Sequence, residues 1–137
     1  MDKKEMYEFI TANPMGYMAT VEGNRPHVRG METYRADEKG LIFYTNKSKD
    51  VSKQIAANPE VEACYFANGT QLRVSGRMEM VEDLELKKEI VEARPFLKPA
   101  VAQAGNYDHM AVCRLNPVKA TTWSMQNMMA GTTPVDL

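Results

Sequence analysis

The chain has 137 residues, of which 44% are hydrophobic and 26% charged, a composition that fits one soluble globular domain with a modest core. Its net charge of -1 excludes the overall basic field of many nucleic-acid-binding domains. No apolar run approaches the roughly 18 residues that cross a bilayer, and the opening MDKKEMYEFI lacks the apolar core of a signal peptide. We therefore expect a single cytoplasmic domain over residues 1–137, with neither a nucleic-acid nor a membrane partner.

The first half of the chain predicts a helix and then three strands joined by tight turns. Met6, Phe9 and Ile10 recur at helical spacing in residues 2–12, and Pro14 ends that helix because the residue before a proline avoids helical geometry. Alternating runs bounded by turn residues then mark the strands. The expected strands cover residues 15–21, 26–35 and 41–45.

The second of these strands has no cleanly apolar face. Counting by two groups His27, Arg29, Met31, Thr33 and Arg35 on one face, and Val28, Gly30, Glu32 and Tyr34 on the other. An edge strand with solvated charges explains this pattern, and so does a strand whose face lines a polar ligand site. The glycine in mid-strand favours close approach of a ligand or of another backbone.

A cationic loop follows the third strand and leads into the next predicted helix. Lys47, Ser48 and Lys49 occupy the loop, Lys53 lies one turn further on, and Ser48 can cap the helix. These groups at a helix N-terminus suit a phosphate, and Arg29 joins them if the second and third strands are neighbours. A solvated lysine cluster is the alternative, although cations there oppose the helix dipole by up to about 1 kcal/mol.

The second half of the chain predicts more antiparallel strands. Asn68-Gly69 is a strong hairpin signal, and Asn116-Pro117 separates two closing strands. Because short turns join most strands, a small antiparallel barrel of six or seven strands with peripheral helices fits best. The expected elements are helices over 50–57 and 83–93, strands over 61–66, 72–81, 110–115 and 118–123, a loosely helical or irregular segment over 96–107 and an irregular tail over 124–137.

The other chemistry-bearing residues give weaker signals. Cys64 and Cys113 lie in apolar runs and are expected to be buried free thiols, and so few cysteines and histidines do not favour a zinc site. Gln54 and Gln71 can hydrogen-bond the edge of a heteroaromatic ring, or lie on the surface. Trp123 either flanks a ring or packs in an ordinary core or interface.

Two segments carry a resemblance to a known family. FYTNKSKDVSKQIAANPEV has an aromatic-Thr strand end, a Ser/Lys loop, a Gln-Ile pair and an Asn-Pro, and QLRVSGRMEMV follows the pattern Gln-x-x-Val-x-Gly-x-x-Glu. Both resemble the pyridoxamine 5′-phosphate oxidase-like family of FMN-binding split barrels. The resemblance runs from about Met15 to Trp123.

The resemblance implies a mainly β (α+β) fold, a six-stranded antiparallel split barrel that forms a homodimer with FMN at the subunit interface. The aligned positions imply that the cofactor-binding residues are Arg29, Gly30, Met31, Glu32, Tyr44, Thr45, Lys47, Ser48, Lys49, Lys53, Gln54, Gln71 and, from the second subunit, Trp123.

The chain also departs from the vitamin-oxidising members of the family. Tyr34 stands where those oxidases carry a lysine, Ser-Lys-Asp replaces their Ser-Arg-Lys loop, and their C-terminal Arg-x-His-Asp-Arg signature is absent from residues 124–137. FMN binding therefore carries over better than pyridoxamine phosphate oxidation does.

We accordingly expect an FMN-dependent oxidoreductase in which the flavin supplies the redox chemistry. NAD(P)H is a candidate electron donor, and His27 and Glu32 are weak candidates for proton transfer. Two alternatives stay open. One is a non-catalytic flavin- or heme-binding carrier or sensor, with His27 or His109 as a heme ligand, and the other is a dimeric scaffold with a vestigial pocket.

Overall fold

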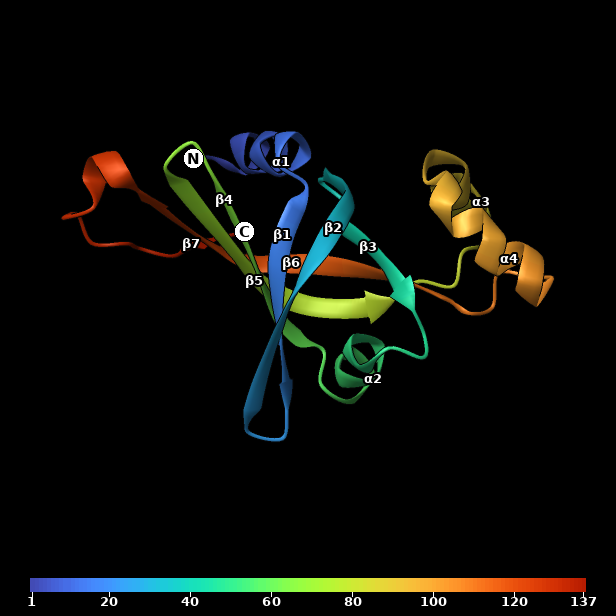
Figure 1. Cartoon of the computed structure of the whole chain (residues 1–137). Coiled ribbons are helices and arrows are strands. Elements are labelled where there is room, and N and C mark those ends of the chain that lie inside the picture. Colours follow the sequence, from blue (N-terminus) through green and yellow to red (C-terminus); the bar gives the residue numbers. More distant parts are fainter.

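The computed structural model describes residues 1–137 and has an antiparallel barrel at its centre (Figure 1). The sheet order is β3-β2-β1-β4-β5-β6-β7, and pairing of β3 with β6 closes the first six strands into a ring. The strands are β1 Met15–Glu22, β2 Arg25–Asp37, β3 Gly40–Asn46, β4 Glu60–Ala67, β5 Thr70–Met80, β6 Met110–Ser124 and β7 Val135–Asp136. The predicted antiparallel split barrel with peripheral helices is confirmed.

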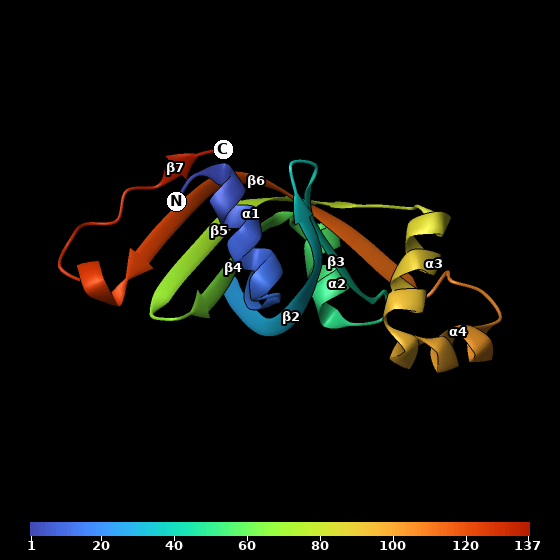
Figure 2. The ribbon, with the colours of Figure 1, turned by 90° about the horizontal axis from the view of Figure 1, so that it is seen from above.

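Four α-helices surround the barrel, and none of them is long and apolar enough to span a membrane. In Figures 1 and 2, α3 and α4 project together to one side, away from α1. The helices are α1 Lys3–Ala12, α2 Asp50–Ala57, α3 Leu84–Ala93 and α4 Lys98–Ala104, with 3-10 turns η1 Pro95–Leu97 and η2 Met125–Asn127. The helical pattern predicted for residues 2–12 is confirmed, and Asp2 caps α1 through the Glu5 amide at 2.8 Å.

The core has two parts because β3 is apolar on both faces. Phe43 points into the barrel, where Met6 and Ile10 of α1 and Val51 of α2 join the same cluster. The next residue back, Ile42, points outward and packs with the apolar side of α3. This two-sided strand holds α3 and α4 beside the barrel, which positions the candidate site described below.

The closing strands predicted over 110–115 and 118–123 form one strand, β6, so the predicted break is wrong. The Asn116-Pro117 step causes a bulge instead, because the pairing shifts by one residue opposite Ser75 and Gly76 of β5. A Cβ at Gly76 would overlap the carbonyl oxygen of Asn116. Glycine at that position therefore lets β5 follow the bulge, and the barrel stays closed.

Two further local predictions are corrected. Ser48 does not cap α2: Lys49 is the N-cap residue, and the Ser48 hydroxyl donates instead to Oδ1 of Asn46 at 2.9 Å. The tail predicted to be irregular contains η2 and β7, and β7 pairs with Lys119 and Ala120 of β6. The segment over 96–107, predicted as loosely helical, holds the end of η1 and all of α4.

The hairpin and cysteine predictions hold with one exception. Asn68 and Gly69 have φ values of 51° and 73°, the left-handed backbone that a tight two-residue hairpin turn requires. Both cysteines are free thiols, as expected, but only Cys113 is buried. Cys64 is half-buried on β4, because its side chain points to the outer face of the sheet.

Candidate functional site

The barrel is split between β2 and β3. The two strands pair only from Thr33 and Phe43 onward, and residues 25–32 of β2 pair with β1 alone. The edge-strand explanation is thus right for the first half of β2 and wrong for the second. In an antiparallel pair every second residue directs both its N–H and its C=O away from the partner strand. Alternate residues of 25–32 therefore present backbone groups to the opening.

A pocket of about 380 Å³ lies at this split. Its size falls within the range of about 300–1,000 Å³ that is typical of small-ligand sites. Four regions line it: β2, the end of β3 with the start of α2, the η1–α4 segment, and the start of β6. The lining residues are Arg29, Gly30, Met31, Glu32, Tyr44, Thr45, Asn46, Lys49, Val51, Phe96, Leu97, Ala100, His109 and Met110.

Arg29 is held firmly in the pocket wall. Its guanidinium donates to Oγ1 of Thr20 at 2.7 Å and to Oε1 of Gln54 at 2.5 Å. Thr20 also donates to that Gln54 oxygen, at 2.6 Å, and both residues are buried. Burial lowers the pKa of Arg29, and the nearby carboxylate of Asp50 opposes that shift. Gln54 therefore orients the arginine from behind, and its acceptor oxygen is already used within the chain.

The start of α2 offers unused donors beside Arg29. The N-cap residue, Lys49, makes no side-chain capping bond and no ion pair, and the amides of Asp50 and Val51 have no hydrogen-bond partner in the chain. A helix N-terminus with free N–H groups and a nearby ammonium is suited to an anion. The carboxylate of Asp50 is the one opposing charge in that first turn.

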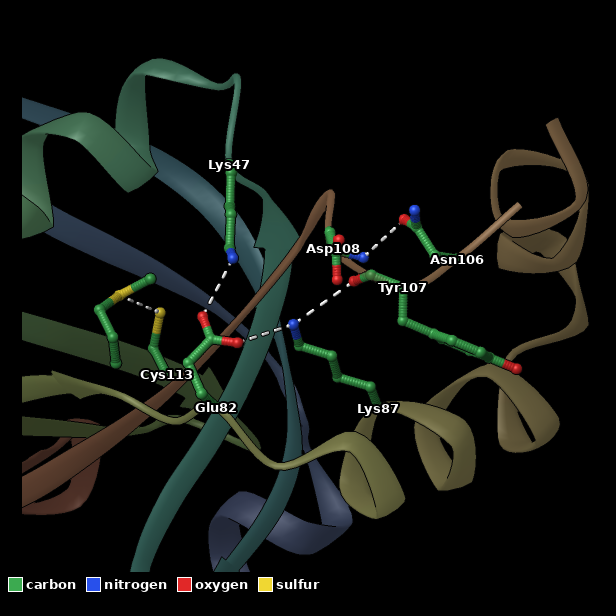
Figure 3. A network of polar contacts seen from close by, with 8 residues as sticks. Lys47, Glu82, Lys87, Asn106, Tyr107, Asp108 and Cys113 are labelled. Carbon is green, nitrogen blue, oxygen red and sulfur yellow. Dashed lines mark hydrogen bonds and ion pairs between the residues drawn. The ribbon is translucent and has the colours of Figure 1, made fainter. Parts of the chain in front are cut away.

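Lys47 is committed elsewhere, although it is two residues from Lys49. Its ammonium pairs with Glu82 at 3.0 Å, and the other oxygen of Glu82 pairs with Lys87 at 3.0 Å (Figure 3). Lys87 is only 4% exposed and also donates to the carbonyl of Tyr107 at 3.4 Å. Lys47 first, and then Lys87, lower the pKa of Glu82. The network ties the loop before α2 to α3 and to the segment before β6.

Glu32 and Tyr44 form a second polar group in the pocket wall. Glu32 accepts from Nε of Arg94 at 2.6 Å and from the Tyr44 hydroxyl at 3.1 Å. Burial first, and then the bond to Glu32, raise the pKa of Tyr44. Arg94 also lies 5.4 Å from the ring centre of Tyr34. Glu32 is therefore an ion-paired carboxylate and does not present itself as a free base.

The structure brings seven of the predicted cofactor-binding residues together in one pocket and leaves six outside its lining. The seven are Arg29, Gly30, Met31, Glu32, Tyr44, Thr45 and Lys49. The six outside are Lys47, Ser48, Lys53, Gln54, Gln71 and Trp123. Gln71 and Trp123 are cross-strand partners on β5 and β6, so their side chains share one face of the sheet.

Sequence reasoning missed the contribution of the second half of the chain to this pocket. Arg94 reaches Glu32 across 62 residues, and no local pattern around Arg94-Pro95 indicates that contact. Phe96 and Leu97 lie in a segment that the sequence predicts only as loosely helical. The sequence suggests His109 only as a heme ligand, because the pairing of β3 with β6 that brings it to the pocket is visible only in the structure.

This barrel, open between two strands and carrying a polar pocket at the opening, defines the class of the protein. The family model for pyridoxamine 5′-phosphate oxidase matches residues 2–124. The chain therefore belongs to the pyridoxamine 5′-phosphate oxidase family.

Named relatives agree with this assignment. A pyridoxine/pyridoxamine 5′-phosphate oxidase of Pseudomonas putida is 35% identical over 90 residues, which are 64% of this chain and 41% of that enzyme. The match thus spans less than half the length of that curated relative. A NimC/NimA family protein from Clostridium acetobutylicum has 28% identity and a TM-score of 0.77, over 97% of this chain and 93% of its own.

A third protein shares the fold at lower identity. A pyridoxamine 5′-phosphate oxidase-related, FMN-binding protein from Nostoc punctiforme is 16% identical, with a TM-score of 0.63 over 98% of this chain and 95% of that one. At this identity the likeness concerns the arrangement of strands and helices alone.

Proposed function

We propose that the chain binds FMN in the pocket between β2 and β3 and is a small flavin-dependent oxidoreductase. The proposal rests on two cationic groups that line the same pocket. One is the guanidinium of Arg29, which hydrogen bonds hold in place, and the other is the free ammonium of Lys49 at the start of α2. A phosphate is the ligand chemistry that both groups favour. The FMN-binding relative from Nostoc punctiforme supports the choice of flavin.

The residues present fit both ends of such a cofactor. Lys49, Arg29 and the unpartnered amides of Asp50 and Val51 would hold the phosphate. The flat ring would lie along the open stretch of β2 at Gly30, where a Cβ would meet only the Gly16 carbonyl oxygen, at 3.9 Å. FMN, when bound, supplies hydride and electron transfer, while the protein binds and orients it.

Apolar side chains would complete the ring end of the pocket. Phe96, which is 67% exposed, and Leu97 line the pocket from η1, and Met110 lines it from the start of β6. Such a wall excludes water from one side of the ring and favours a flat substrate on the other. Because Glu32 is paired with Arg94 and His27 lies outside the pocket, neither is our choice for proton transfer.

The activity we propose differs from pyridoxamine phosphate oxidation. The last fourteen residues, SMQNMMAGTTPVDL, contain no arginine or histidine with which to hold the phosphate of a vitamin. Tyr34, in place of a lysine, is bonded through its hydroxyl to Glu89 at 2.7 Å. We propose NAD(P)H as the electron donor.

A second copy of the chain is the partner that we propose for the outer face of β1, β2 and β4. Met15, Tyr17, Val28 and Phe66 are each more than half exposed on this face. Tyr17 is the register partner of Gly30, so the apolar face runs directly into the pocket. Apolar exposure of this kind is typical of a subunit interface. In the homodimer, Trp123 of the partner subunit would flank the cofactor.

Titration of the purified protein with FMN, followed by quenching of flavin fluorescence, tests the proposal. Saturable binding of about one FMN per chain is expected, with bleaching of the bound flavin on anaerobic addition of NADH or NADPH. Absence of binding at micromolar concentrations would refute FMN as the cofactor. Binding without bleaching by either nucleotide would retain the flavin and reject the nicotinamide donor.

A further inference from the structure

We propose that His109 is a further binding residue of this pocket, and that its Nε2–H donates a hydrogen bond to the phosphate of the bound cofactor. The inference rests on the proposed function, because it names a contact to the same ligand. It adds a donor from the residue that precedes β6 to a phosphate end otherwise built from β2 and α2.

The pairing of β3 with β6 brings His109 beside the end of β3 and the loop before α2. Thr45 pairs with Ala111, and the carbonyl of His109 accepts from the amide of Lys47 at 2.9 Å. Alternate residues of a strand face opposite sides, and Met110 packs in the cluster beneath α3. His109, the residue before β6, instead lines the pocket together with Thr45 and with Lys49 at the start of α2.

The nitrogens of the His109 ring are unused within the chain. Nδ1 is buried and has no hydrogen-bond partner, and Nε2 makes no hydrogen bond either. Nδ1 has no acceptor in reach, so we place the proton on Nε2, to which the pocket can offer a ligand acceptor. Because the ring lines the pocket, Nε2 is the nitrogen that can serve a ligand there.

The backbone around His109 is fixed before any ligand arrives. The carbonyl of Tyr107 accepts from the amide of Met110 at 3.1 Å and from the ammonium of Lys87 at 3.4 Å. The amide of Asp108 donates to Oδ1 of Asn106 at 3.1 Å (Figure 3). A donor held in place in this way loses little conformational freedom on binding, which makes its hydrogen bond more effective.

Two other donors of the lining are already engaged within the chain. The guanidinium of Arg29 is shared with Thr20 and Gln54, and the Tyr44 hydroxyl is directed to Glu32. Lys49 is exposed at the rim, where its ammonium moves freely and is screened by water. A phosphate that accepts from His109 as well would be bound by β2, by the start of α2 and by the residue before β6.

The test compares FMN with riboflavin, which has the same ring system but no phosphate, in wild type and three variants. His109→Phe keeps a ring of similar size and removes both nitrogens. His109→Gln places an amide N–H near the position of Nε2, and His109→Asn places one near Nδ1. Dissociation constants come from fluorescence quenching, and thermal unfolding of each apoprotein verifies that the variant is folded.

We expect His109→Phe to weaken FMN binding by tenfold or more and to leave riboflavin binding within twofold, as befits a hydrogen bond to a charged group. His109→Gln is expected to restore most of the loss, and His109→Asn little of it. Unchanged FMN affinity in His109→Phe, or an equal loss for both flavins, would overturn the inference and leave the proposed function intact. If wild type binds no FMN, both fail together.

Discussion

At the scale of single residues, the neighbours of a cation decide whether it is available to a ligand. Lys47 and Lys49 are two lysines of the same loop, two positions apart in the sequence. Lys47 is neutralised by Glu82, whereas Lys49 has no ion-pair partner. The sequence predicts the cluster of lysines correctly. It does not show which lysine is free for a ligand, because Glu82, the partner of Lys47, is 35 positions further along the chain.

The first prediction concerns Lys49. We expect Lys49→Ala to weaken FMN binding by about 1.5–3 kcal/mol, because it removes a charge-assisted contact to the phosphate. Lys39→Ala, which removes an exposed lysine from the β2–β3 turn, is the matched control and should leave the affinity unchanged. Isothermal titration of both variants measures the difference. Equal affinities in the two variants would exclude Lys49 from the site.

The second prediction concerns Gln54, whose buried oxygen accepts from both Arg29 and Thr20. Gln54→Leu keeps the volume and leaves the buried Thr20 hydroxyl and an N–H of the half-buried Arg29 without their acceptor, so the free energy of unfolding should fall by about 1–3 kcal/mol. FMN affinity should also fall, because Arg29 loses its orientation. Urea unfolding measures the stability. Lys53→Ala, an exposed change on the same helix, should stay within about 0.5 kcal/mol of wild type.

At the scale of elements, the pocket exists because β2 and β3 separate beyond Thr33 and Phe43. The sequence predicts both strands, and the mixed polarity of residues 26–35 favours a ligand site on β2. It does not predict where the two strands part, because β3 pairs instead with β6, far along the chain, and α3 packs against both of those strands. The break predicted at Asn116-Pro117 fails for a related reason. A glycine on the neighbouring strand, Gly76, allows a bulge where the local sequence indicates a turn.

The third prediction concerns the ion pairs of Glu82, which join three segments around the pocket. Glu82→Gln replaces the carboxylate beside Lys87, which is 4% exposed, with a neutral amide, so this buried ammonium loses its opposite charge and stability at neutral pH should fall. Because the Glu82 side chain is 62% exposed and screened by water, we expect a loss of only about 1 kcal/mol. Glu85→Gln, which removes a surface partner of Lys88, should cost less than about 0.5 kcal/mol.

The stability difference between wild type and Glu82→Gln should depend on pH. The pKa of Glu82 is lowered from its ordinary 4.5, chiefly by Lys47 and then by Lys87. A carboxyl group whose pKa falls on folding stabilises the protein fully above its unfolded pKa and loses that effect as the pH drops through its folded pKa. The difference in thermal stability between wild type and Glu82→Gln should therefore be constant near neutrality and shrink below about pH 4.5. A difference that stays constant down to pH 3 would contradict this role.

At the scale of the whole molecule, the family assignment and the closed ring of strands account for the motifs found in the sequence. They also explain why Gln71 and Trp123 lie outside the pocket of their own chain. Both belong to the outer face of the sheet, beside the apolar side chains that we propose as the subunit interface. A single sequence cannot say which face meets a partner, because a strand that faces a partner and a strand that faces a core show the same alternation.

The fourth prediction tests that interface. Tyr17→Glu and Val28→Glu each place a charge in the centre of the exposed apolar face, so both should shift the protein from dimer to monomer. Met129→Glu, at a residue that is 93% exposed in the tail, is the control and should leave the dimer intact. Sedimentation velocity measures the mass of each species. A wild-type protein that is monomeric at micromolar concentration would exclude a second copy of the chain as the partner of this face.

The absorption spectrum of the purified protein, taken after saturation with FMN and removal of unbound flavin by gel filtration, shows whether the pocket holds FMN. We expect the absorption bands of oxidised flavin, at a stoichiometry of about one per chain, and their loss when Lys49→Ala is combined with His109→Phe. A colourless wild-type protein after the same treatment, or one that retains heme and shows a Soret band in place of flavin, would contradict FMN binding.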